Sequence, residues 1–219
     1  MFKKLADNRD QGSLAVQFRK KRFAFFYSLL SGLKRPVNIL DIGGTEDYWK
    51  MMELDASDKV YVTLLNLTEI DVQLPNIKSI SGDARNLKAG DSSFDVVFSN
   101  SVIEHVGSYE DQSRMAKEVC RVGKCYFVQT PNKYFPLEPH FLFPFFQFLP
   151  MKIRVFLLQN FNLGWFEKTP YAVKAKEIVE SIRLLSRREF VALFPKARIY
   201  EEKIFGITKS FVAYGGWSE

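Results

Sequence analysis

The stretch from Val37 to Trp49 places the tightest constraint on the fold. It joins a short apolar run, preceded by Pro36, to two consecutive glycines and then to a segment that can begin a helix. Such a run predicts a buried parallel strand. Glycines after the strand let the backbone approach a ligand closely, and the next helix turns free N–H groups towards it. The stretch therefore predicts a nucleotide-type site at the first strand-to-helix turn of an open α/β sheet, with an ordinary tight turn as the alternative.

The rest of the chain alternates between strand and helix patterns. A helix with an apolar face is expected to begin at Ser13, and a capping box from Ser186 to Glu189 predicts another near the end. Further helices are expected over 46–54, from Ser108 to Gly123, and over 172–185. Strands are expected over 60–65, 77–80, 94–98 and 125–129, with an antiparallel pair over 197–204 and 207–213. Alternation of this kind predicts an α/β fold with a doubly wound, mostly parallel sheet.

One segment interrupts this alternation. Residues 132–168 are rich in Phe, Leu and Pro, and their prolines exclude one long helix. We expect a lid of short helices over the strand ends. Its aromatic side chains suit a hydrophobic substrate pocket, docking on a membrane surface, or simply the core of the lid. The predicted organisation is therefore a helical extension over 1–36 and a domain over 37–219 that carries the 132–168 insertion.

The formal charge of +6 leaves nucleic acid and anionic membranes open as partners. The basic run from Arg19 to Arg22 suits a phosphate contact, but a solvated helix face is the simpler interpretation. No basic and aromatic stripe lies near the expected site, so nucleic acid is not expected, while peripheral membrane contact stays open. Cys120 and Cys125 form neither a disulfide framework nor a zinc site, and no metal is expected. With no secretory signal after the charged residues Met1 to Asn8, we expect a cytoplasmic protein.

Taken in order, the motifs resemble those of class I S-adenosylmethionine-dependent methyltransferases. The matching segments are the first-strand motif at 39–44, Asn66 at the end of the second strand, the loop 82–84, the fourth-strand motif at 94–106, and the closing helix and hairpin from 185–190 to 209–213. The resemblance covers Val37 to Tyr214. It implies a Rossmann-like, seven-stranded sheet with an antiparallel C-terminal hairpin.

The resemblance also implies a set of residues that bind S-adenosylmethionine. The glycines would admit the methionine portion, an acidic residue before them would accept from its ammonium group, Asn66 would bind the ribose, and Asp83 with the Ala84 N–H would bind the adenine. An amide at the end of the fourth strand would line the pocket. The expected cofactor-binding residues are thus Asp41, Gly43, Gly44, Asn66, Asp83, Ala84 and Asn100.

Three positions depart from the family pattern. Thr45 and Asp47 stand where further glycines are usual, and Asn66 stands where the family usually carries a carboxylate. An amide gives only neutral hydrogen bonds, and charge-assisted ones are roughly twice as strong. These departures motivate a rival hypothesis, a non-catalytic binding or partner subunit with a degenerate glycine loop. A dinucleotide oxidoreductase is disfavoured because its glycine fingerprint is missing.

The expected activity is methyl transfer to an O- or N-nucleophile of a small or lipid-linked acceptor. Such an acceptor benefits from a base that titrates near neutral pH. His105 and His140 are the two histidines. His140 lies in the expected lid, where an acceptor would enter, and is the candidate catalytic base. His105 belongs to the fourth-strand motif and is expected to shape the pocket wall.

Overall fold

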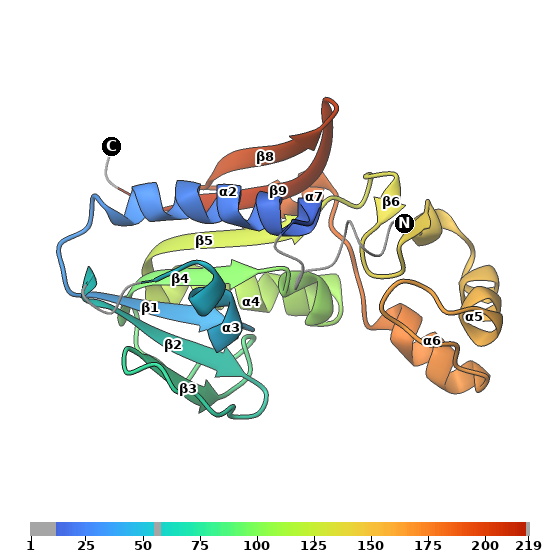
Figure 1. The fold of residues 1–219 in the computed structure, drawn as a ribbon, viewed down its shortest axis with the longest axis horizontal. Coiled ribbons are helices and arrows are strands. Elements are labelled where there is room, and N and C mark those ends of the chain that lie inside the picture. The colour runs from blue at the N-terminus through green and yellow to red at the C-terminus, as the bar shows by residue number, and fades with distance from the viewer. Residues whose placement is uncertain (1–11, 55–57, 218–219) are drawn as a thin grey trace.

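The computed structural model describes residues 12–54 and 58–217, which form one large sheet covered by helices and a lobe beyond one end of it (Figure 1). The seven strands are β1 (Val37–Ile42), β2 (Val60–Asn66), β3 (Ile77–Ser81), β4 (Phe94–Asn100), β5 (Gly123–Pro131), β8 (Arg198–Ile204) and β9 (Ile207–Gly215). Each predicted strand is present within two residues of its expected bounds. Their spatial order is β3-β2-β1-β4-β5-β9-β8.

The pairing confirms the Rossmann-like prediction. The first five strands pair in parallel, whereas β9 runs antiparallel to both β5 and β8. The strand order reverses between β1 and β4, which are adjacent. In open α/β sheets, ligands bind beyond the carboxyl ends of the strands at this switch point. The fold thus directs attention to the loops that follow β1 and β4.

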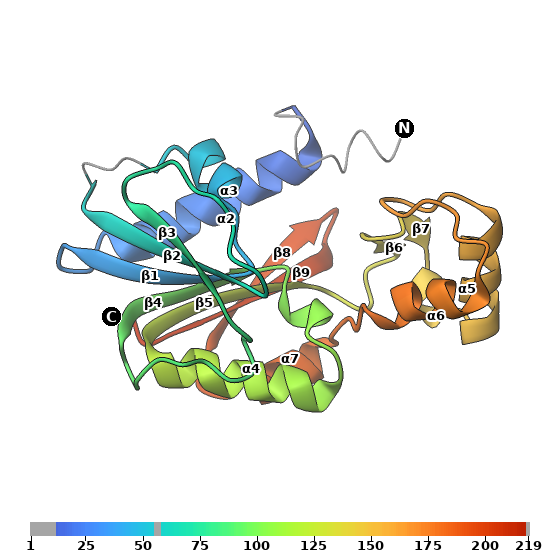
Figure 2. The ribbon, with the colours of Figure 1, turned by 90° about the horizontal axis from the view of Figure 1, so that it is seen from below.

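Helices cover both faces of the sheet (Figure 2). On one face lie α2 (Leu14–Leu30) and α3 (Glu46–Met51), and on the other lie α4 (Tyr109–Val122) and α7 (Arg187–Leu193). The predicted start signals are confirmed: Ser13 caps α2, and Ser108 and Ser186 each form a complete capping box. Stacked aromatic rings such as Phe98 and Phe127, 5.6 Å apart, fill the core beneath α2 and α3.

The basic run on α2 is not a uniformly solvated face, so the simpler interpretation is wrong at Arg22. This guanidinium is buried, and its Nε and Nη2 donate to Glu202 at 3.0 and 2.6 Å. Its Nη1 donates to Asn100 Oδ1 and to Gln129 Oε1. A buried charge is tolerated when it is paired and hydrogen-bonded in this way. The amphipathic pattern of α2 did not reveal the pair, because Glu202 is distant in the sequence.

The lobe beyond the strand ends, here called the lid lobe, spans residues 133–182. It contains β6 (Leu137–Glu138), β7 (Phe143–Pro144), α5 (Met151–Asn160), α6 (Ala172–Glu180) and a short 3-10 turn at Phe146–Phe148. It has its own core, made of Phe141, Phe146, Leu158, Leu163, Ala175 and Val179. The predicted short helices are present. The helix expected over 172–185 ends at Glu180, and an extended segment then returns the chain to the sheet, where the backbone N–H of Arg183 donates to the Glu104 carbonyl at 2.8 Å.

Among the described residues, no helix has the length and apolar character needed to cross a bilayer.

Candidate active site

A pocket of about 360 Å³ lies among the loops that follow β1, β2, β3 and β4. This strand-end pocket has a size usual for small-molecule sites, which are roughly 300–1,000 Å³. Four of the predicted cofactor residues line it: Gly43, Asn66, Asp83 and Ala84. The structure therefore gathers residues from three separate motifs around one cavity at the switch point of the sheet.

Asp41 and Gly44 lie behind the pocket wall rather than on its lining. Asp41 is buried, its Oδ2 accepts from Trp49 Nε1 at 2.7 Å, and its Oδ1 has no hydrogen-bond partner. Burial raises the pKa of Asp41 to about 8. A Cβ on Gly44 would stand 1.8 Å from Asp41 Oδ2. The glycine therefore lets the loop fold directly over this carboxyl group.

The other glycine and the atypical loop residues also have local structural causes. Gly43 has a φ of +72°, and a Cβ there would lie 2.5 Å from Val102. Thr45 is the N-cap of α3, where its hydroxyl accepts from the backbone of Tyr48. Asp47 lies in the first turn of that helix, where negative charge favours the helix dipole. The departures from the family's glycine pattern thus serve the start of a helix.

The polar groups of the strand-end pocket are held by short-range contacts. The side-chain amide of Asn66 donates to the Gly44 carbonyl at 3.0 Å. Asp83 accepts from the backbone and the guanidinium of Arg85, and this hydrogen bonding lowers the pKa of Asp83. Arg85 itself lines the pocket and was not predicted, although its position two residues after an aspartate was a possible signal. Asn100 lies outside the lining, because Arg22 engages its oxygen.

Two histidines meet at the edge of this pocket. His105 lines the cavity, and its ring lies perpendicular to that of His140 with 4.9 Å between centroids. His140 comes from the lid lobe, so the contact joins the lobe to the sheet. The desolvation of His105 and the nearby charge of His140 lower the pKa of His105 to about 4. Of the two rings, His105 is the one held neutral near neutral pH.

A buried glutamate orients His140. The Nδ1 atom of His140 lies 2.7 Å from Glu138 Oε1, and Glu138 Oε2 accepts from the backbone N–H groups of His140 and Phe141. Because a carboxylate only accepts, Nδ1 carries the hydrogen and Nε2 is the nitrogen left to take up a proton. Burial opposes protonation of His140, but Glu138 and the charge of Glu104 outweigh it and raise its pKa.

Glu104 completes this cluster. Its carboxyl group is buried, Oε2 accepts from Thr130 Oγ1 at 3.1 Å, and Oε1 has no hydrogen-bond partner. Burial raises the pKa of Glu104 to about 7, although the charge of His140 opposes this. One ligand atom each of Glu104, His105 and His140 lies within 4.8 Å of the others. Two imidazoles and a carboxylate can bind a transition metal, and the expectation of no metal stays a prediction.

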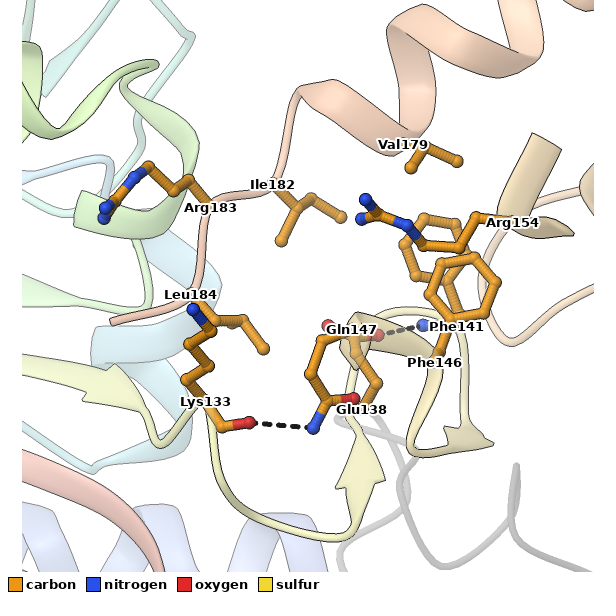
Figure 3. Close-up of a pocket in the computed structure, with 10 residues that line it drawn as sticks. All are labelled: Lys133, Glu138, Phe141, Phe146, Gln147, Arg154, Val179, Ile182, Arg183 and Leu184. Carbon is orange, nitrogen blue, oxygen red and sulfur yellow. Dashed lines mark hydrogen bonds between the residues drawn. The ribbon is translucent and has the colours of Figure 1, made fainter. Parts of the chain in front are cut away.

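A second cavity of about 210 Å³, here called the lid pocket, lies between the lid lobe and the sheet (Figure 3). Apolar side chains from the lobe and from the segment after α6 form much of its wall, and Glu138 also lines it. His105 lines the strand-end pocket, and His140 contacts both His105 and Glu138. A chain of contacts from His105 through His140 to Glu138 therefore links the lining of one cavity to the lining of the other.

Comparison with known proteins gives sequence matches that cover parts of the chain. Residues 40–125 match a family model described as a methyltransferase domain. An uncharacterized protein of Mycobacterium tuberculosis is 42% identical over 53 residues, and this alignment covers 24% of the present chain and 18% of that protein.

Solved structures match over most of the chain. A SAM-dependent methyltransferase of Methanosarcina mazei has a TM-score of 0.51 at 17% identity, over 85% of this chain and 95% of the other. Magnesium protoporphyrin IX methyltransferase of Synechocystis, solved with bound SAH (S-adenosylhomocysteine), has a TM-score of 0.54 at 12% identity, over 91% and 83% of the two chains. Residues 40–125 thus match a methyltransferase domain, and the chain shares the fold of solved S-adenosylmethionine-dependent methyltransferases.

Proposed function

We propose that the protein transfers a methyl group from S-adenosylmethionine in the strand-end pocket to an acceptor in the lid pocket. The observation that carries this proposal is the chain of contacts from His105, which lines the strand-end pocket, through His140 to Glu138, which lines the lid pocket. A methyltransferase must bring two substrates together while keeping separate sites for them. Two separate cavities whose linings are linked by a titratable group suit that requirement.

The lining of the strand-end pocket fits the cofactor. The backbone at Gly43 is open to a ligand on the cavity side, and the carboxyl end of β2 presents Asn66 there, as a ribose site requires. Asp83 and Ala84 follow β3 and would serve the adenine. The unpaired Oδ1 of Asp41 is a buried acceptor behind the loop and suits the ammonium group, directly or through a water molecule. Asn100 would act through the Arg22 network rather than by direct contact.

The chemistry requires alignment and one proton acceptor. When bound, S-adenosylmethionine supplies both the electrophilic methyl group and the leaving group. In this proposal His140 Nε2 accepts the proton that the O- or N-nucleophile of the acceptor loses. Glu138 holds the imidazole in the required tautomer and stabilises the imidazolium that forms. The neutral ring of His105 packs on His140 and closes the cavity wall without competing for the proton.

The lid lobe would bind the body of the acceptor. Phe141 and Phe146 line its pocket with their rings 4.1 Å apart, so an apolar portion of a small or lipid-linked molecule would pack against these rings. Burial of such surface contributes about 25 cal/mol per Å². The acceptor would therefore help to exclude water from the histidine pair.

Transfer of a labelled methyl group tests this function. The purified chain is incubated with methyl-labelled S-adenosylmethionine and fractionated extracts, beginning with lipid and phenolic fractions. We expect label to enter at least one fraction, and added S-adenosylhomocysteine to suppress the incorporation. If the cofactor binds and no fraction is labelled, the chain is instead the non-catalytic partner subunit that Thr45, Asp47 and Asn66 first suggested.

A further inference from the structure

We propose that the lid pocket binds a carboxylate, and that the methyl acceptor is therefore an acid with an apolar body. The inference deepens the proposed function. It rests on that function only for the claim that the bound acid is the methyl acceptor. The assignment of a carboxylate site to the pocket itself rests only on the side chains that line it. Two of these side chains, Arg154 and Gln147, carry buried polar atoms without hydrogen-bond partners.

Arg154 is the first of these side chains. It projects from α5 into the cavity, where its neighbours include Val179 and Ile182 (Figure 3). Its Nε atom is buried and has no hydrogen-bond partner. Among the described residues none forms an ion pair with it, and Glu180 affects it only as a nearby charge. A guanidinium keeps its charge in proteins and presents a planar fork that matches a carboxylate, so an anionic group in this cavity would pair with it.

Gln147 is the second. Its Nε2 donates to the backbone carbonyls of Lys133 and Phe135 at 2.8 and 2.9 Å, which fixes the orientation of the amide. Its Oε1 is left buried without a partner. The cavity thus offers an unfilled donor on Arg154 and an unfilled acceptor on Gln147. A ligand that carries a carboxylate and, separately, an O–H or N–H group would satisfy both.

Three other charged side chains line the cavity, those of Lys133, Glu138 and Arg183. Glu138 holds His140, and Arg183 donates to Gln112 and Glu189. With Arg183 paired to Glu189, the positive charges of Arg154 and Lys133 and the negative charge of Glu138 leave one net positive charge at the cavity, which a monoanion neutralises. A carboxylate therefore fits better than a phosphate ester. The apolar wall would hold the rest of the molecule.

Affinity measurements with three matched probes test the carboxylate site. The intact chain is titrated calorimetrically with 4-phenylbutanoate, 4-phenylbutan-1-ol and 4-phenylbutyl phosphate. We expect the carboxylate to bind at least tenfold more tightly than the alcohol and more tightly than the phosphate ester. Arg154→Gln should remove the preference over the alcohol, and Arg154→Lys should leave part of it. Lys152→Gln is the matched control on the same helix, and because Lys152 is exposed it should keep the full preference.

Several results would overturn the inference. Equal affinity for the acid and the alcohol would do so, as would a preference that survives Arg154→Gln, and tighter binding of the phosphate ester would exclude the carboxylate class. Far-UV circular dichroism of each variant shows that it is folded. If S-adenosylhomocysteine, the cofactor product, fails to bind while the Arg154-dependent preference is present, the proposed function fails and the carboxylate site stands. If the cofactor product binds and the preference is absent, only the carboxylate site is wrong.

Discussion

The two cavities of this protein are built in opposite ways. The strand-end pocket is formed by the first residues of four loops, each of which directly follows a strand of one sheet. Its polar groups are already engaged by near neighbours, as Asp83 is by Arg85 and Asn66 is by Gly44. The lid pocket is formed by segments between residues 133 and 184, and it leaves atoms of Arg154 and Gln147 without partners.

This difference suits one cavity to binding a common cofactor and the other to selecting a particular acceptor. A pocket whose polar groups are fixed by the local backbone can be kept while the rest of the chain changes, which suits a common cofactor. A pocket that leaves buried donors and acceptors unfilled is complementary to a particular ligand, because each unsatisfied buried group costs about 1–3 kcal/mol until a partner arrives. We therefore assign the cofactor to the first cavity and acceptor selection to the second.

Removal of the group between the cavities should have the largest effect. General-base catalysis contributes typically 10²–10⁴-fold, so we expect His140→Ala to lower kcat by about 100-fold once an acceptor is known. The affinity for S-adenosylhomocysteine should stay unchanged, because His140 lies outside the strand-end pocket lining. Steady-state kinetics and calorimetry measure the two quantities. Wild-type turnover across the pH range would show that His140 is not the base.

The loop behind the wall of the strand-end pocket should be sensitive to added volume. Gly44→Ala would place a methyl group against the buried Asp41 carboxyl, and overpacking of this kind typically costs 1–3 kcal/mol, so we expect a destabilisation of about 2 kcal/mol. Urea unfolding followed by circular dichroism gives the free energy. Gly90→Ala is the control, since nothing lies within 4 Å of a Cβ there. Equal destabilisation by the two substitutions would show that overpacking against Asp41 is not the cause.

The pH dependence of turnover reports on the link between the cavities. His140 must be neutral to accept a proton, and its pKa is raised, so we expect the acidic limb of kcat to lie above the ordinary value of 6.5. Glu138→Gln should move that limb down by about one pH unit, because it removes an opposite charge.

With two histidines in the sequence, imidazole NMR can follow both: His105 should titrate below 6.5 and His140 above it.

The same pKa shift has a consequence for stability. Because the folded-state pKa of His140 is raised, its charged pair with Glu138 stabilises the fold fully below the unfolded pKa, and this contribution is lost as pH rises through the folded value. In Glu138→Gln the free energy of unfolding should therefore fall relative to wild type more at pH 6 than at pH 9. A difference that does not vary with pH would contradict the pairing.

Chelation should have the smallest effect. If the cluster of Glu104, His105 and His140 works by proton transfer, EDTA should leave kcat unchanged, and excess Zn²⁺ should inhibit by occupying the imidazoles. Turnover with and without each reagent measures this. Loss of activity in EDTA that Zn²⁺ or Mn²⁺ restores would instead make the histidines metal ligands.

The sequence predicted the fold, and it named four residues that line the strand-end pocket, for a physical reason. Strand-end residues such as Gly43 and Asp83 are placed by the local backbone, so contiguous motifs reveal them. Arg22, Arg154 and the contact between His105 and His140 depend on segments that meet only after folding. The contact between Glu138 and His140 was the easiest of the remaining contacts to predict, because the two residues are only two positions apart in the sequence.

Titration of S-adenosylhomocysteine into the intact protein tests the central claim most directly. At a hundred times its dissociation constant, a ligand that binds only the folded state stabilises it by about 2.7 kcal/mol, so thermal shift and calorimetry should both detect it. We predict one saturable site per chain, with affinity sharply weakened in Asp83→Ala and unchanged in Asp91→Ala, an exposed aspartate outside the pocket lining. No binding at millimolar ligand would contradict the assignment of the strand-end pocket to the cofactor.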